Sequence, residues 1–198
     1  MQDELIAALP ARTGHFLLES GHHGDLWLDL DAFFLRPAAL RPFAVELAKR
    51  LSAHAIDAVC GPLTGGAFVA QMIAAELDLA CFHAERIVRG QGAALPAVEY
   101  RIPHALRAAA RGKNVAIVDD AINAGSALRG TAADLQRCGA HIVAIGALLV
   151  LGPAASHFAA DRAIPLEHIA ALPNVLWSPA DRPLCAARIP LDDIRAFP

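Results

Sequence analysis

The stretch Val115-Ala-Ile-Val-Asp-Asp-Ala-Ile-Asn-Ala-Gly-Ser-Ala127 decides the fold expected of this sequence. The apolar run at residues 114–118 is typical of a strand in the buried middle of a parallel sheet. The carboxylates of Asp119 and Asp120 follow it, and then come a short loop and a helix that begins near Ser126. Loop amides and a helix N-terminus bind anions, and carboxylates accept hydrogen bonds from sugar hydroxyls. The stretch therefore predicts a site for a ligand with both a ribose and a phosphate.

The acidic pair is also compatible with other roles. Two acids after a strand can cap the following turn without any ligand. An Asp-Asp pair in this position also fits a phosphoacceptor or magnesium site. The stretch by itself leaves these alternatives open.

The surrounding sequence alternates strand and helix patterns. Strands are expected at residues 57–60, 79–82, 114–118 and 142–151, and helices at residues 42–51, 67–77 and 126–138. This alternation predicts an α/β fold with an open parallel sheet flanked by helices. Ligands of such sheets bind at the carboxyl ends of the strands.

The two ends of the chain lack this alternation. A short helix is expected at residues 2–9, and two strands at residues 15–18 and 25–30. After Gly152 the sequence is rich in proline, which predicts a tail or small cap and not another helix–strand unit. We therefore expect a single domain over residues 1–198, with a core at about 36–152 and a hood from about 1–35 and 153–198.

Composition excludes several classes of protein. Of the 198 residues, 56% are hydrophobic and 19% are charged, which excludes a disordered chain. The formal net charge of −3 excludes the basic footprint of a nucleic-acid-binding protein. The N-terminus has acids and no basic n-region, so no signal peptide is expected, and the apolar run at residues 142–151 is too short to span a bilayer. These features predict a cytoplasmic protein with no membrane partner.

The cysteines and a histidine pair are expected to be structural. The four cysteines (Cys60, Cys81, Cys138 and Cys185) are far apart and form no C-x-x-C pair. This spacing predicts buried, reduced thiols and neither a disulfide framework nor a structural zinc site. His22 and His23 lie in a predicted turn, where solvent-facing side chains are expected.

Two further features fall near predicted carboxyl ends of strands. The loop Gly61-Pro-Leu-Thr-Gly-Gly66 allows close approach of backbone to a ligand, although it matches neither G-x-x-x-x-G-K-[ST] nor G-x-G-x-x-G. Residues 87–96 have no periodicity and predict a mobile loop, which would allow Arg86 and Arg89 to close over a polyanion. A turn without ligand and solvated surface arginines are the alternatives.

These motifs together resemble type I phosphoribosyltransferases. Val115 to Ala127 is similar to the family's signature for phosphoribosyl diphosphate (PRPP), and Gly61 to Gly66 is similar to its diphosphate loop. The N-terminal Gly14-His-Phe-Leu-Leu-Glu-Ser-Gly-His-His-Gly-Asp-Leu-Trp-Leu-Asp-Leu30 resembles the orotate branch, as does the tail from Pro183 to Leu191. The resemblance covers nearly the whole chain and implies the type I phosphoribosyltransferase fold with a small hood.

The resemblance also implies roles for individual residues. Asp119 and Asp120 would hold the ribose hydroxyls of PRPP, and Arg86 and Arg89 would act with them in catalysis. The 5-phosphate would bind to the amides of Ala121, Ile122, Asn123, Ala124, Gly125, Ser126 and Ala127, and the diphosphate to Gly61, Pro62, Leu63, Thr64, Gly65 and Gly66. The base pocket would be formed by Phe16, Ser20, Gly21 and Trp27. Mg²⁺ would be held through PRPP, with no direct protein ligand.

The implied activity is transfer of the phosphoribosyl group from PRPP to a pyrimidine base, orotate, with release of diphosphate. A homodimer is expected, because the N-terminal region carries four large aromatic residues that a single small domain does not cover: Trp27, Phe33, Phe34 and Phe43.

Departures from the family pattern keep alternatives open: Ala124 and Ala127 stand where Thr or Ser is usual. Gly65 stands where a basic residue is common, and no lysine lies between Lys49 and Lys113. The alternatives are a salvage enzyme for another base and a non-catalytic PRPP- or nucleotide-binding regulator.

Overall fold

The computed structural model describes residues 1–18, 21–89, 97–178 and 180–192, which form two sheets with flanking helices. The larger sheet has the strand order β5-β4-β3-β6-β7-β8. Its strands are β3 (Ala58–Pro62), β4 (Ala80–Arg89), β5 (Ala97–Arg101), β6 (Asn114–Ile122), β7 (His141–Leu151) and β8 (Leu166–Leu172). All neighbouring pairs are parallel except β4 and β5, so the predicted open parallel sheet is confirmed.

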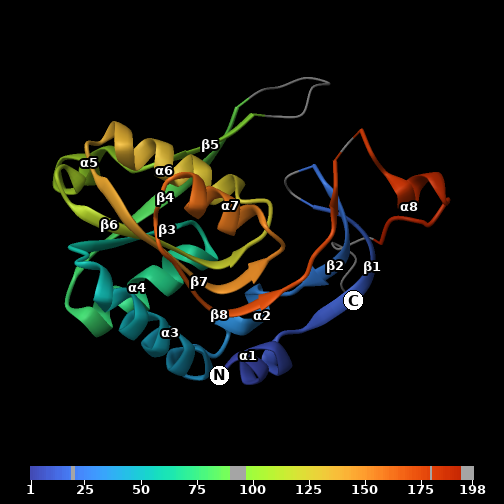
Figure 1. The fold of residues 1–198 in the computed structure, drawn as a ribbon, viewed down its shortest axis with the longest axis horizontal. Coiled ribbons are helices and arrows are strands. Elements are labelled where there is room, and N and C mark those ends of the chain that lie inside the picture. Colours follow the sequence, from blue (N-terminus) through green and yellow to red (C-terminus); the bar gives the residue numbers. More distant parts are fainter. Residues whose placement is uncertain (19–20, 90–96, 179, 193–198) are drawn as a thin grey trace.

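Helices cover both faces of this sheet (Figure 1). One face carries α1 (Gln2–Ala8), α3 (Pro37–Leu51) and α4 (Gly65–Leu77), and the other carries α5 (His104–Ala110), α6 (Ser126–Arg137) and α7 (Ala154–Asp161). Alternate side chains of one strand serve the two cores, since successive residues point to opposite faces. On β6, Val118 packs in the core of α3 and α4, whereas Ile117 packs in the core of α5, α6 and α7.

The hood is a separate three-stranded sheet with the order β1-β2-β9, at the right of Figure 1. It consists of the antiparallel hairpin β1 (Ala11–Leu17) and β2 (His23–Leu28), with β9 (Leu176–Trp177) added to β2. The short helix α2 (Asp31–Phe34) leads back to the core, the 3₁₀ turn η1 (Ser52–His54) follows α3, and α8 (Pro183–Ala186) follows β9. Both hairpin strands begin and end earlier than the sequence pattern predicts.

The predicted boundary between core and hood is wrong at the C-terminal side. Residues 154–172 form α7 and β8, a further helix–strand unit whose strand pairs in parallel with β7. The prolines that argued against this unit lie outside its elements, because Pro153 precedes α7 and Pro165 precedes β8. The sheet core therefore extends to Leu172, and only the residues after it join the hood.

Two other segments are more regular than expected. Residues 87–89 belong to β4 and residues 97–101 to β5, which pair as an antiparallel hairpin, so the predicted loop is shorter; residues 90–96 lie outside the described residues. The helix α3 begins at Pro37, five residues before its predicted start, and contains Pro42. Pro37, at the start of the helix, costs no hydrogen bond. Pro42 lies inside the helix and removes one hydrogen bond, a loss that burial of Leu40, Phe43 and Leu47 offsets.

Several burial predictions also need correction. Cys60 and Cys138 are buried free thiols as expected, whereas Cys81 and Cys185 are exposed free thiols. His23 is buried, not solvent-facing, with 5% of its surface exposed. Phe33 and Phe43 are buried against each other, so they supply no exposed aromatic surface for a dimer. Among the described residues, no helix is long and apolar enough to cross a membrane.

Candidate active site

The acidic pair lies on the last part of β6, beside the start of α4. The sequence pattern ends this strand at Val118, but β6 continues to Ile122 because β7 runs beside it and pairs with it as far as Val150. The strand therefore holds Asp119 and Asp120 on a rigid backbone. The main-chain N–H of Asp120 donates a hydrogen bond of 3.1 Å to Oδ1 of Asp119.

Burial controls the protonation of this pair. Only 7% of Asp119 is exposed. Burial raises the pKa of Asp119 well above its usual range, and the neighbouring charge of Asp120 raises it further. Burial also raises the pKa of Asp120. Each carboxyl is therefore harder to ionise than an exposed aspartate until hydroxyl donors or a cation compensate its negative charge.

Two glycines allow α4 to approach these carboxylates. A Cβ atom at Gly65 would collide with the carboxylate of Asp120, and a Cβ atom at Gly66 would collide with Oδ1 of Asp119. The positive end of the helix dipole consequently faces the acidic pair. The preceding loop includes a cis peptide bond between Leu63 and Thr64, and the N–H of Leu63 donates to the carbonyl oxygen of Ala84.

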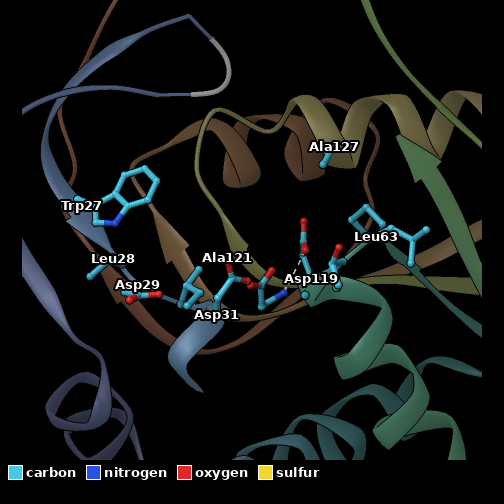
Figure 2. A pocket seen from close by; sticks show the side chains of 14 residues that line it. Trp27, Leu28, Asp29, Asp31, Leu63, Asp119, Ala121 and Ala127 are labelled. Carbon is cyan, nitrogen blue, oxygen red and sulfur yellow. Dashed lines mark hydrogen bonds between the residues drawn. The ribbon is translucent and has the colours of Figure 1, made fainter. Parts of the chain in front are cut away.

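Two cavities meet at Asp119, and Figure 2 shows the larger one from close by. The larger cavity has a volume of about 310 Å³. Trp27 of β2 and Asp29, just after that strand, lie across from Asp119 and Leu63. Its lining consists of Trp27, Leu28, Asp29, Leu30, Asp31, Pro62, Leu63, Thr64, Gly65, Gly66, Asp119, Asp120, Ala121 and Ala127. The smaller cavity, of about 200 Å³, is lined by Leu18, Tyr100, Asp119, Ala121, Ile122, Asn123, Ala124, Gly125, Ser126, Ala127 and Leu128. Asp119 thus borders both.

The larger cavity is strongly acidic. Four carboxylates line it, those of Asp29, Asp31, Asp119 and Asp120, and its described lining contains no lysine, arginine or histidine. A polyanion entering this cavity therefore requires a cation to offset the repulsion. Oxygen donors of this kind are the ligands that Mg²⁺ prefers, together with phosphate oxygens of a substrate.

The smaller cavity lies at the N-terminus of α6, where an anion is favoured. Gly125 precedes the helix with a φ of 73°. The first N–H groups of an α-helix have no partner within the helix and can bind an anion. Asn174, which follows β8, donates from Nδ2 to Oδ1 of Asn123 over 2.9 Å. The Nδ2 group of Asn123 is a further donor beside the loop.

Sequence reasoning missed one basic residue next to Gly125, Arg129, which is not among the residues lining the smaller cavity. A Cβ atom at Gly125 would lie 2.9 Å from Nη1 of Arg129, so the guanidinium folds back over the start of α6. The signal in the sequence is the spacing of four between Gly125 and Arg129, which places both on one side of the first helical turn. The guanidinium adds a positive charge near the positions where Ala124 and Ala127 lack hydroxyl groups.

Three other predicted site residues are not seen to line either cavity. Arg86 lies on β4, paired with Tyr100 of β5, and lines neither of these two cavities; the side chain of Arg89 and the whole of Ser20 lie outside the described residues.

The residues predicted to form the base pocket do not line one common cavity. Trp27 lines the larger cavity, and its Nε1 is buried without a hydrogen-bond partner among the described residues. Phe16 is buried beneath it, with ring centroids 6.2 Å apart, and lines neither cavity. Gly21 forms the hairpin turn with a φ of 78° and also lies outside both linings.

Comparison with known proteins agrees with this arrangement. The model of the phosphoribosyl transferase domain family matches residues 41–163, more than half of the chain. The orotate phosphoribosyltransferase of Caldanaerobacter subterraneus subsp. tengcongensis is 27% identical over 180 residues, covering 90% of this chain and 86% of that protein.

Solved structures show the same fold. The orotate phosphoribosyltransferase of Mycobacterium tuberculosis superposes with a TM-score of 0.62 at 20% identity, covering 85% of this chain and 93% of that one. The adenine phosphoribosyltransferase of Thermoanaerobacter pseudethanolicus superposes with a TM-score of 0.67 at 16% identity, covering 86% and 99%.

Proposed function

The chain belongs to the phosphoribosyl transferase domain family, and from this premise we propose that it transfers the phosphoribosyl group of PRPP to a pyrimidine base, orotate, and releases diphosphate. The observation that carries the proposal is the position of Asp119 between two cavities of unequal size. The smaller cavity suits the 5-phosphate, and the larger cavity suits the diphosphate and the base. The ribose then lies along the acidic pair.

The ribose hydroxyls provide the hydrogen-bond donors that the acidic pair needs. The buried Asp119 and the half-buried Asp120, both with raised pKa values, gain when hydroxyl groups donate to their oxygens. As the bond between C1 and the diphosphate oxygen breaks, its electron pair leaves with the diphosphate and positive charge develops on the sugar. The ionised carboxylates of Asp119 and Asp120 stabilise that charge. A ring nitrogen of the base bonds to C1 and releases its proton to water.

Mg²⁺ is part of the proposal because of the acidic lining. The carboxylates of Asp29 and Asp31, across the cavity from Asp119, are suitable outer partners for the waters of a bound cation. The cation supplies charge compensation for the leaving diphosphate. The glycine loop at residues 61–66 and the start of α4 orient the diphosphate through main-chain groups.

Orotate is supported by the curated relatives of that name and by the aromatic hood strand. A neutral base, as in a salvage reaction, is the second candidate. It is favoured by the four carboxylates of the larger cavity, because they repel the carboxylate that orotate carries.

The experiment is an assay of PRPP- and Mg²⁺-dependent diphosphate release with orotate, uracil and adenine as separate acceptors. Turnover with orotate, lost in Asp119→Asn, supports the proposal, and turnover with uracil or adenine alone supports the second candidate. Calorimetric PRPP binding without turnover for any base favours the non-catalytic regulator instead.

We further propose a cytoplasmic homodimer. All four cysteines are free, as expected in a reducing compartment. Phe34 packs on Phe68, which is 46% exposed, and the adjacent Leu35 is 82% exposed, so α2 and α4 present an apolar surface. Light scattering should find a dimer that Phe68→Asp converts to a monomer, whereas the control Val175→Asp, at a side chain 51% exposed on the hood, stays dimeric.

A further inference from the structure

Three side chains converge on the hood, away from both cavities. His15 comes from β1, His23 from β2 and Cys185 from α8. His15 Nε2 lies 2.7 Å from His23 Nδ1, and Cys185 Sγ lies 3.8 Å and 3.7 Å from these two nitrogens. Only 1% of His15 and 5% of His23 are exposed, whereas Cys185 is at the surface.

These distances are close to those of zinc ligands. Zinc binds sulfur at about 2.3 Å and imidazole nitrogen at about 2.0–2.1 Å in tetrahedral geometry. Such bonds place sulfur about 3.6 Å from each nitrogen and the nitrogens about 3.3 Å apart. The two sulfur–nitrogen distances already agree within about 0.2 Å. The two imidazoles need to separate by about 0.6 Å.

The hydrogen bond made by Nδ1 of His15 favours metal binding through its other ring nitrogen, Nε2. Its Nδ1 is 2.7 Å from the carbonyl oxygen of Ile189, which can only accept, so Nδ1 carries the proton and donates it. The lone pair of a neutral His15 therefore lies on Nε2, the atom that faces His23 and Cys185. A second hydrogen bond from the remote ring nitrogen to a carbonyl is the usual support of a metal-bound histidine.

The C-terminal segment is hydrogen-bonded to the main chain of His15. The main-chain N–H of His15 donates to Oδ2 of Asp192 over 2.8 Å, and the N–H of Asp192 donates to the carbonyl oxygen of His15 over 2.7 Å. These two hydrogen bonds fix the position of the segment that carries Cys185 relative to β1. They therefore determine from which side the Cys185 thiol approaches the two imidazoles.

We propose that His15, His23 and Cys185 bind a zinc ion, with the fourth position open to water on the exposed side of Cys185. The ion fastens α8 to the β1–β2 hairpin. The thiol loses its proton on binding, and His23 presents the lone pair of Nδ1 with its proton on Nε2. Leu18, just after β1, lines the smaller cavity, so the clamp holds a hairpin that borders the proposed PRPP site.

The test is a titration of metal-free, thiol-reduced protein with Co²⁺, followed by displacement with Zn²⁺ in competition with a chromophoric chelator. We expect one ion per chain and a thiolate-to-cobalt charge-transfer band in the near ultraviolet that Zn²⁺ abolishes. Cys185→Ser should lose the band and more than about 100-fold in zinc affinity, beyond the usual cost of removing a supporting residue. Since Cys185 is exposed, this variant should keep the fold, which circular dichroism checks.

The controls separate this site from the acidic pair. Cys81→Ser removes the other exposed thiol, and His22→Ala removes the neighbouring histidine; both should bind Zn²⁺ like the wild type. Asp119→Asn should also bind Zn²⁺ normally while losing PRPP, so failure of the proposed function leaves this test intact. Absence of the charge-transfer band in the wild type, or its survival in Cys185→Ser, overturns the zinc site.

Discussion

The carboxylate of Asp120 occupies the space in which a side chain at Gly65 would lie. This contact explains why the proposed diphosphate loop has no basic residue at that position. A lysine or arginine there requires the acidic pair to move, because α4 begins directly against it. The positive charge for a diphosphate must then come from a cation or from another element.

Gly65→Ala is expected to weaken PRPP binding by about tenfold or more, since the added methyl displaces the Asp120 carboxylate from the position proposed to bind the ribose. Isothermal titration with PRPP and Mg²⁺ measures the effect. Gly24→Ala is the matched control, because a Cβ atom there meets its nearest neighbour at an ordinary 3.4 Å. Equal affinity in Gly65→Ala and wild type would show that Asp120 does not contact the ligand.

Asp119→Asn is expected to abolish PRPP binding and yet stabilise the unliganded fold at neutral pH. The folded protein raises the pKa of Asp119, so ionising this buried carboxyl costs stability as pH rises above the pKa of the unfolded chain. The amide removes that cost and still accepts the N–H of Asp120 through Oδ1. We therefore expect a higher free energy of unfolding for Asp119→Asn than for the wild type at pH 7.

Urea unfolding at several pH values measures this gain. The difference between Asp119→Asn and wild type should disappear below about pH 4, where the carboxyl is protonated in both states. A variant that is less stable than wild type at pH 7 contradicts the raised pKa.

Ala124→Thr combined with Ala127→Thr is expected to tighten PRPP binding by about tenfold or more, because each hydroxyl donates to a charged phosphate. Both alanines line the smaller cavity, which has about 200 Å³ of space. Ala127 belongs to α6, and Ala133→Thr, at an exposed position of α6, controls for changes in the stability of that helix. Unchanged affinity would mean that Asn123, Ser126 and Arg129 already satisfy the phosphate.

Arg129→Gln is expected to weaken PRPP binding by about 10- to 100-fold, the range for a hydrogen bond to a charged group. The guanidinium lies over Gly125 at the N-terminus of α6. Arg137→Gln, in the last turn of that helix, should have no effect on affinity. Raising the salt concentration should reduce the difference between Arg129→Gln and wild type, since salt screens the attraction of an exposed charge.

The central unit was predictable because its signals are local. The run from Val115 to Ser126 combines an apolar strand, two acids and a helix start, so the fold class follows from neighbouring residues alone. The α7–β8 unit was missed, because its prolines suggested irregular structure. Pairing of β8 with the long strand β7 outweighs that local signal.

The sequence by itself determined the open α/β sheet and the presence of an acidic pair beside an anion cradle. Only the tertiary structure decided which groups meet across the chain. Gly65 and Asp120 lie on different elements, and Cys185 is 162 residues from His23, so no periodicity or spacing relates them. Such contacts arise from sheet order and from the path of the C-terminal segment over the hood, and these are set by packing of the whole chain.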